Sequence, residues 1–268
     1  MSDYTATAAT NQAAMQQACN QCDADEATEQ QDEAQLNKDL ANPPANPDDV
    51  SYILTILVDC LDVYGDKAAV TTDTQNVAAA GLSFESSINQ EIASGAAGDA
   101  NPYDPNNPDD TAESQDLINN MYYFYSDLEG TGGVDMSMIN GADKASMESN
   151  LDNIAAQLWV AGGGPSEPYA ITPQTLAYDG QWAAGLVHTG LVAFTDTPAS
   201  GGTINPQFSS AQDSTQALES TLGTENQIAT TDYQSWVSMC NEVESVAGDF
   251  ISDNQSSMQY FTNKQVTN

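Results

Sequence analysis

Positive charge is nearly absent from this sequence. Its 268 residues include four lysines, no arginine and one histidine, against 39 aspartates and glutamates, so the formal net charge is −35. Nucleic-acid binding depends on clustered Lys and Arg side chains that displace counterions from phosphates. Anionic membranes repel a surface of their own sign. Because four scattered lysines cannot form such a cluster, we expect neither a nucleic-acid partner nor binding to anionic membranes.

The sequence also lacks the motifs on which common catalytic mechanisms depend. The single histidine, His188, lies in an apolar run, and no G-x-S-x-G nucleophile elbow accompanies it. Cys19 and Cys22 have C-x-x-C spacing, but acidic residues follow them directly, and these raise a thiol pKa rather than lower it. Further zinc ligands lie far away in the sequence. We therefore expect a protein that is not an enzyme and that needs no cofactor.

Long hydrophobic runs are missing as well. The apolar stretch 52–58 is far too short to span a bilayer. Residues 1–23 have neither the basic nor the apolar region of a cleaved secretory signal. We expect an extracellular or cell-surface protein that is exported without a cleaved Sec-type signal. The alternative is the cytoplasm of a halophile, where salt screens the repulsion between carboxylates.

What the sequence does contain is helical periodicity. After an acidic, polar N-terminal arm (1–49), apolar residues fall at steps of three and four from Val50 to Tyr64, as on one buried face of a helix. A weaker pattern continues toward Gly98, and further helices are predicted at about 112–128 and between Met136 and Trp159. We treat residues 50–164 as one helical region.

Residues 165–207 differ in composition from the rest. They contain five prolines, several glycines and the apolar run 186–194, which has the length and content of a strand. We predict a Gly/Pro-rich insert here with a candidate β-hairpin. The predicted fold is therefore mostly α, with long helices forming a bundle or coiled coil and a loop-rich or small β insert at about 165–207.

The most regular pattern lies in the last segment, 208–268. From Leu222 to Phe261, steps of three and four residues place one seam along about five heptads, which predicts a long C-terminal helix in a coiled coil or bundle. Cys240 lies on this seam and Cys60 on the seam of 50–64. If the two helices pair, these thiols could form a disulfide outside the cell.

Apolar and aromatic residues exceed what a single core requires, and exposed aromatic patches mark interfaces. The residues 122–125 carry four consecutive aromatics, so a helix must show them on more than one face, unless they form a tightly wrapped core. Our candidates for an assembly interface are Leu57, Leu61, Tyr122, Phe124, Tyr233, Trp236, Val243, Phe250 and Phe261.

An acidic, proline-broken loop at 99–110 carries oxygen ligands of the kind that Ca²⁺ prefers. It lacks the residue order of an EF-hand, so a solvated loop is the alternative. The candidate Ca²⁺ ligands are Asp99, Asn101, Asp104, Asp109 and Asp110.

Three segments resemble the extracellular filament and translocator proteins of type III secretion systems, such as the EspA-like sheath filament. They are the apolar helix 53–64, the stretch MSMINGADKASMESNLDNIAAQL at 136–158, and the closing helix 218–261. The resemblance implies a subunit that polymerises through coiled coils between copies, and it transfers no functional residues.

We accordingly expect a structural subunit that assembles with itself into an extracellular filament, tube or sheath. Open-ended assembly needs two distinct contact surfaces on each copy, and the chain has at least two apolar helix faces. The alternative is a soluble, acidic binding module of the halophile type, with Ca²⁺ as a candidate ligand.

Overall fold

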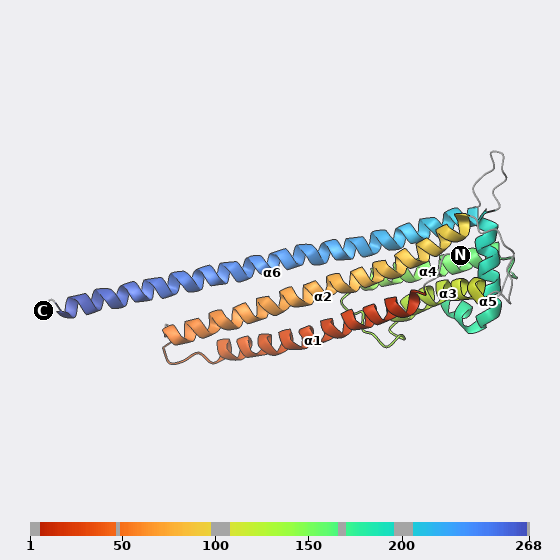
Figure 1. Cartoon of the computed structure of the whole chain (residues 1–268). Helices are drawn as coiled ribbons and strands as arrows, with labels where there is room; N and C mark the ends of the chain where they lie inside the picture. Colours follow the sequence, from red (N-terminus) through yellow and green to blue (C-terminus); the bar gives the residue numbers. More distant parts are fainter. Residues whose placement is uncertain (1–5, 47–48, 98–107, 166–169, 196–205, 267–268) are drawn as a thin grey trace. The chain divides into compact units, whose positions relative to one another are not determined.

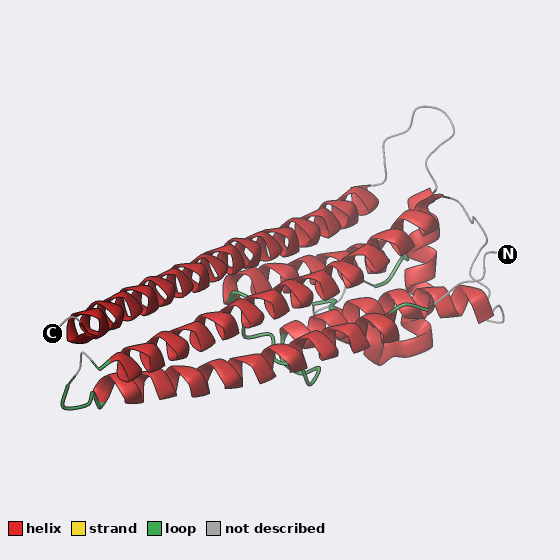
Figure 2. Ribbon diagram, turned by 60° about the vertical axis from the view of Figure 1, so that its left-hand side comes forward, coloured by secondary structure: helices red, strands yellow, loops and turns green. Residues whose placement is uncertain are grey.

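The computed structural model describes residues 6–46, 49–97, 108–165, 170–195 and 206–266, and of the helical residues 94–97, 108–110 and 260–266 it describes only the backbone. Six α-helices account for most of the described residues, which contain no β-strand (Figures 1 and 2). The mostly α-helical fold with long, packed helices was predicted correctly. The helices are α1 (Ala8–Ala41), α2 (Val50–Ala97), α3 (Pro108–Leu128), α4 (Gly141–Ala161), α5 (Pro173–Thr195) and α6 (Pro206–Val266).

The chain divides into two compact units. Unit 1 consists of Met1–Asn20 and Thr74–Gln227, and unit 2 consists of Gln21–Asp73 and Ile228–Asn268. The boundaries fall inside α1, α2 and α6, so each of these helices contributes residues to both units. The two units are described separately below.

Unit 1 holds the larger hydrophobic core. In it, α5 packs against both α3 and α4, which it crosses at a steep angle in Figure 1. Phe84 of α2 stacks on Phe124 of α3 with ring centroids 5.3 Å apart, and both side chains are fully buried. Along α4, the steps of three and four predicted from the sequence bury Met147 and Leu151. Each such side chain contributes about 1.5–3 kcal/mol when it is fully buried.

The predicted β-hairpin is wrong, because the apolar run 186–194 lies inside α5. Pro173, which we interpreted as a loop residue, is the first residue of this helix, a position where proline is well tolerated. Gly190 permits a close approach of α5 to α4, since a side chain there would overlap the carbonyl oxygen of Leu158. A short apolar run does not distinguish a strand from a helix buried on several sides.

A buried polar cluster fixes the N-terminus of α1 in unit 1. The carboxylate of Asp116 accepts hydrogen bonds from the backbone N–H groups of Thr7 and Ala8, at 2.8 and 3.1 Å. The amide of Asn120 donates to the Thr7 hydroxyl, and Asn11 donates in turn to the Asn120 side-chain oxygen, both at 2.9 Å. The carboxylate satisfies N–H groups that have no partner within the helix and complements the positive end of its dipole.

Unit 2 contains segments of three helices. The α1 and α2 segments form an antiparallel hairpin, with the Tyr52 hydroxyl donating to the Asp39 carbonyl oxygen at 3.1 Å near the connecting loop (Figures 1 and 2). The α6 segment runs beside α2. Burial here is sparse: among the described residues of this unit, the fully buried apolar side chains are Cys22, Val63, Ala68 and Ala229.

Candidate assembly surface

The α6 segment of unit 2 is exposed over most of its surface. Its half-buried residues follow steps of three and four and include Trp236, Cys240, Val243, Ala247, Phe250 and Asn254. This is the spacing predicted from the sequence, and it marks the face that α6 turns toward its neighbour.

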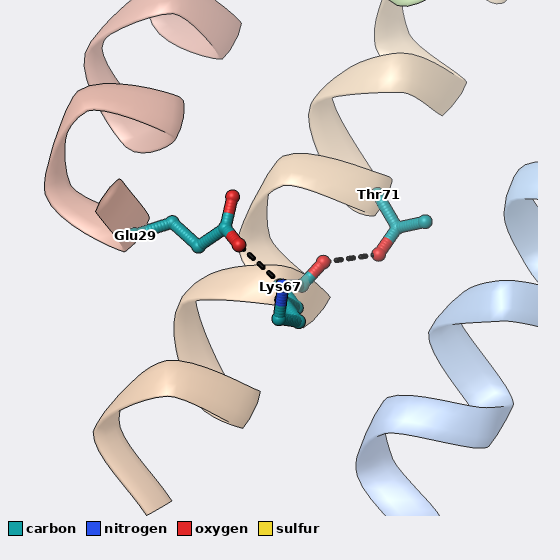
Figure 3. A network of polar contacts seen from close by, with 3 residues as sticks. All are labelled: Glu29, Lys67 and Thr71. Atoms are coloured by element: carbon teal, nitrogen blue, oxygen red, sulfur yellow. Dashed lines mark hydrogen bonds and ion pairs between the residues drawn. The ribbon is translucent and has the colours of Figure 1, made fainter. Parts of the chain in front are cut away.

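One lysine connects all three helices of unit 2. Tyr64 of α2 stacks on Trp236 of α6 with ring centroids 6.0 Å apart, and the Lys67 ammonium lies 5.4 Å from the Trp236 ring centroid. The same ammonium lies 2.5 Å from Oε1 of Glu29 on α1, and the Thr71 hydroxyl donates to the Lys67 carbonyl oxygen (Figure 3). An exposed cation–π contact contributes roughly 0.5–1 kcal/mol.

The α2 helix has two covered faces in unit 2 and one open face. Asp59 and Asp66 face α1, because they contact Asp39 and Asp32 of that helix. Tyr64 faces α6, because its ring stacks on Trp236. On the third face, Ser51, Thr55 and Val58 are exposed and line a shallow hollow together with Leu54 and Asp59. We call this surface the α2 groove; its residues follow the helical repeat along one stripe.

The α6 helix continues past the level at which α2 begins. Because Trp236 lies opposite Tyr64 in antiparallel helices, Phe250 is level with Val50, the first residue of α2. The following residues, 251–266, form the α6 tail, which is about 24 Å long at 1.5 Å per residue. Ile251 and Met258 of this tail are 43% and 65% exposed.

The face of α1 toward α2 in unit 2 is lined with carboxyl groups. Its half-buried residues are Asp25, Glu26, Glu29, Asp32, Leu36 and Asp39, of which five are acidic. Asp59 forms a side-chain hydrogen bond with Asp39; burial, then that bond, raises the pKa of Asp59. Burial, followed by a hydrogen bond with Asp32, raises the pKa of Asp66 to about 6. Each bonded pair needs one proton, which one carboxyl donates to the other.

Unit 1 contains comparable groups. Burial, followed by the nearby charge of Glu219, raises the pKa of Glu85 to about 7. Burial, followed by a side-chain hydrogen bond with Asp143, raises the pKa of Glu225 to about 7. The fully buried Asp127 accepts a hydrogen bond from Gln12 at 3.2 Å, and burial raises its pKa to about 6. The sequence analysis did not identify any of these carboxyl groups with raised pKa. An excess of acidic residues indicates that some carboxyl groups lie close together, but it does not indicate which ones.

The candidate interface residues separate into two sets. Six lie in unit 2 and are half-buried or exposed: Leu57, Leu61, Tyr233, Trp236, Val243 and Phe250. Two lie in α3 of unit 1, where Tyr122 is half-buried and Phe124 is fully buried in the core. Phe124 therefore has no exposed surface in the single chain. The side chain of Phe261 lies outside the described residues.

Cys60 and Cys240 occupy corresponding positions in unit 2. Cys60 precedes Tyr64 by about one helical turn and Cys240 follows Trp236 by the same distance, so both lie on the facing sides of antiparallel helices. Both are half-buried free thiols, and burial followed by the charge of Asp59 raises the pKa of Cys60. Their disulfide stays a prediction.

The Ca²⁺ ligands also stay a prediction. Asp99, Asn101 and Asp104 lie outside the described residues; Asp109 and Asp110 fall in the first turn of α3, where only the backbone is described. Within the described part of the chain, no group of three or more His, Cys, Asp or Glu side chains is placed to hold a metal ion.

His188 contacts the core of unit 1. Its Nδ1 lies 3.4 Å from the hydroxyl oxygen of Ser114, joining α5 to α3. Ser114 itself is fully buried, so in this arrangement its hydroxyl is closed to a substrate. The contact is of the kind that satisfies polar groups inside a core.

Comparison of the chain with protein-family models, curated proteins and solved structures finds no match. The resemblance to type III secretion filaments thus stays a prediction. Among the described helices, none combines the length and hydropathy that crossing a membrane would require.

Proposed function

We propose that the chain is a structural subunit that assembles with itself, through helix packing, into an extracellular filament, tube or sheath. The observation that carries the proposal is the incomplete burial of the first part of α2. Eleven of the fifteen residues in 50–64 are apolar, Cys and Tyr included, and they cover most of the helix circumference apart from the polar stripe of Ser51, Thr55, Asp59 and Asp62, yet only Val63 among them is fully buried. An apolar face of this width is typical of a helix that is buried more completely in a larger structure.

The second support is the presence of two different open surfaces in unit 2. The α2 groove and the α6 tail have different shapes and residues. A contact between two unlike surfaces repeats from copy to copy and generates a ring or an open helical polymer. The scarcity of Lys and Arg is consistent with an extracellular polymer, because it leaves few sites for trypsin-like proteases.

Pelleting by ultracentrifugation, combined with negative-stain microscopy, tests the proposal. The chain is examined from low to high NaCl and CaCl₂, because the repulsion between copies of net charge −35 must be screened before they associate. We expect ordered polymers in the pellet above a threshold of salt. A single small species under every condition would contradict the proposal.

The contacts between carboxyls favour a second candidate, a soluble acidic binding module of the halophile type. Pairs such as Asp32 with Asp66 bring like charges together, which concentrated salt would relieve. Such a module would remain monomeric or dimeric in sedimentation and would lose helical circular dichroism at low salt. Adding CaCl₂ at constant ionic strength would show whether Ca²⁺ acts beyond screening.

A further inference from the structure

The first turns of α5 in unit 1 carry a hollow of about 440 Å³. Four residues line it: Gln174, Thr175, Tyr178 and Asp179. Because they are spaced at one, three and four residues, they share one face of the helix. The volume falls within the range that is typical of ligand sites in proteins. We call this surface the α5 hollow.

Hydrogen bonds hold the start of α5 and one wall of the hollow in place. The Thr175 hydroxyl donates to the Thr172 carbonyl oxygen at 2.8 Å and accepts from the Thr172 backbone N–H at 2.9 Å. The Gln174 amide donates to the carboxylate of Glu129, just after α3, at 2.5 Å. None of these bonds involves Tyr178 or Asp179, and both of these side chains are exposed.

Aromatic side chains are unusually exposed on α5. Tyr178 is 93% exposed, so the face of its ring is open to a ligand. Further along the helix, Trp182 is 55% exposed and packs edge-on against Trp159, with ring centroids 5.1 Å apart. Exposed aromatic side chains mark interfaces with other proteins. The α5 helix therefore offers an aromatic surface to a partner.

Charge determines which partner fits the α5 hollow. An aromatic face next to a carboxylate suits a guanidinium group, which stacks on the ring and donates hydrogen bonds to the carboxylate. Tyr178 and Asp179 supply these two groups in the same hollow. A second copy of the chain cannot supply the guanidinium, because the sequence contains no arginine. The net charge of −35 attracts basic proteins and repels acidic ones.

We propose that the α5 hollow binds an arginine side chain on a basic segment of a different protein. The guanidinium stacks on the Tyr178 ring and donates hydrogen bonds to the Asp179 carboxylate. The hollow belongs to unit 1, whereas the α2 groove and the α6 tail belong to unit 2. This contact therefore goes beyond self-assembly and does not require it.

Titration of the full-length chain with short peptides, followed by saturation-transfer NMR, tests the proposal. The probe is a Gly-Arg-Gly peptide with both ends blocked, and its analogue with citrulline in place of arginine has nearly the same shape without the charge. We expect the Kd of the arginine peptide to be at least ~3-fold lower than that of the citrulline peptide. Added NaCl should reduce this difference.

Variants of the hollow locate the binding. Tyr178→Ala removes the ring and Asp179→Asn removes the charge, and each should raise the Kd of the arginine peptide about 3-fold. Tyr178→Phe keeps the ring and should restore most of the affinity that Tyr178→Ala loses. Asp232→Asn is the matched control, because it removes the same charge at an exposed position on α6 and should leave the Kd unchanged.

Four results would overturn the inference. The first is an absence of saturation transfer to the arginine peptide, and the second is equal binding of the citrulline peptide. The third is a wild-type Kd for both Tyr178→Ala and Asp179→Asn. The fourth is an effect of Asp232→Asn as large as that of Asp179→Asn, because the peptide would then respond to the net charge of the chain rather than to the α5 hollow.

Discussion

Replacing Glu85 with glutamine should stabilise unit 1 near neutral pH and have little effect in mild acid. Glu85 is 5% exposed, its Oε1 has no hydrogen-bond partner, and Glu219 adds a like charge nearby. These conditions disfavour the ionised carboxylate. Glutamine has nearly the same shape and carries no charge, so the substitution removes the ionisation and keeps the packing.

The magnitude follows from the pKa of Glu85, which is about 7 in the folded chain against an ordinary value of 4.5 for a glutamate in water. Between these values the folded chain binds more protons than the unfolded chain, so the free energy of unfolding rises as the pH falls from about 7 toward 4.5. Between about pH 7.5 and pH 5 a shift of this size contributes at most ~2.5 kcal/mol. Solvent screening reduces it, and we expect about 1 kcal/mol.

Urea unfolding, followed by circular dichroism at both pH values, measures the effect. The quantity of interest is the difference between the two stability changes caused by Glu85→Gln, because any penalty from the glutamine N–H groups is present at both pH values and cancels. Asp213→Asn, an exposed position on α6 in unit 1, is the control and should change stability by less than about 0.5 kcal/mol.

Equal effects of Glu85→Gln at the two pH values would refute the reasoning. That outcome would mean that Glu85 is already protonated near neutral pH or is solvated in solution. Destabilisation confined to the neutral condition would be stronger evidence against it, since the carboxylate would then have a stabilising partner.

Three further results are expected. Phe124→Ala should lower the free energy of unfolding by about 3–5 kcal/mol in urea titrations, because it empties a core position; a change under about 1 kcal/mol with loss of assembly would return Phe124 to the interface. Gly132→Ala should destabilise the chain by about 1–3 kcal/mol, since the added methyl group overlaps the Asp127 carboxyl; an unchanged melting temperature would contradict that packing. Mild oxidation should join Cys60 to Cys240 within one chain, detectable by peptide mapping without reductant, and exclusively intermolecular cross-links would argue against their facing positions.

The helices were largely predictable from the sequence where one face is buried and the other is exposed to solvent. The seam from Trp236 to Asn254 illustrates this, since its steps of three and four survive in the burial pattern. The weaker pattern after Tyr64 was harder to interpret, because glycines interrupt it. The structure shows one continuous α2, and at Gly81 the absence of a side chain admits Leu222, whose Cδ2 would lie 2.7 Å from an added Cβ.

Contacts between distant segments were not predictable. The pairing of Asp32 with Asp66 depends on the register of the α1–α2 hairpin, and the pattern of 39 acidic residues is compatible with many registers. The α2 groove could not be predicted either. The residues from Val50 to Tyr64 have the pattern of a buried helix, and this pattern does not indicate which other helices cover it. Only the positions of α1 and α6 show which face is left open.

Acid and salt should therefore act on different parts of unit 2. The carboxyl pair Asp32–Asp66 lies between α1 and α2, whereas the groove residues Ser51, Thr55 and Val58 are exposed; Asp59, which pairs with Asp39, lines the edge of the groove. Lowering the pH toward about 5 protonates Asp66, whose pKa is raised to about 6, and should stabilise the hairpin within each chain. Adding NaCl at neutral pH mainly screens the repulsion between chains. If assembly uses the groove, salt at neutral pH should lower the concentration required for it, while melting of the hairpin should respond more to pH. If assembly and melting instead responded in the same way to pH and to NaCl, closure of the hairpin and assembly would be one process.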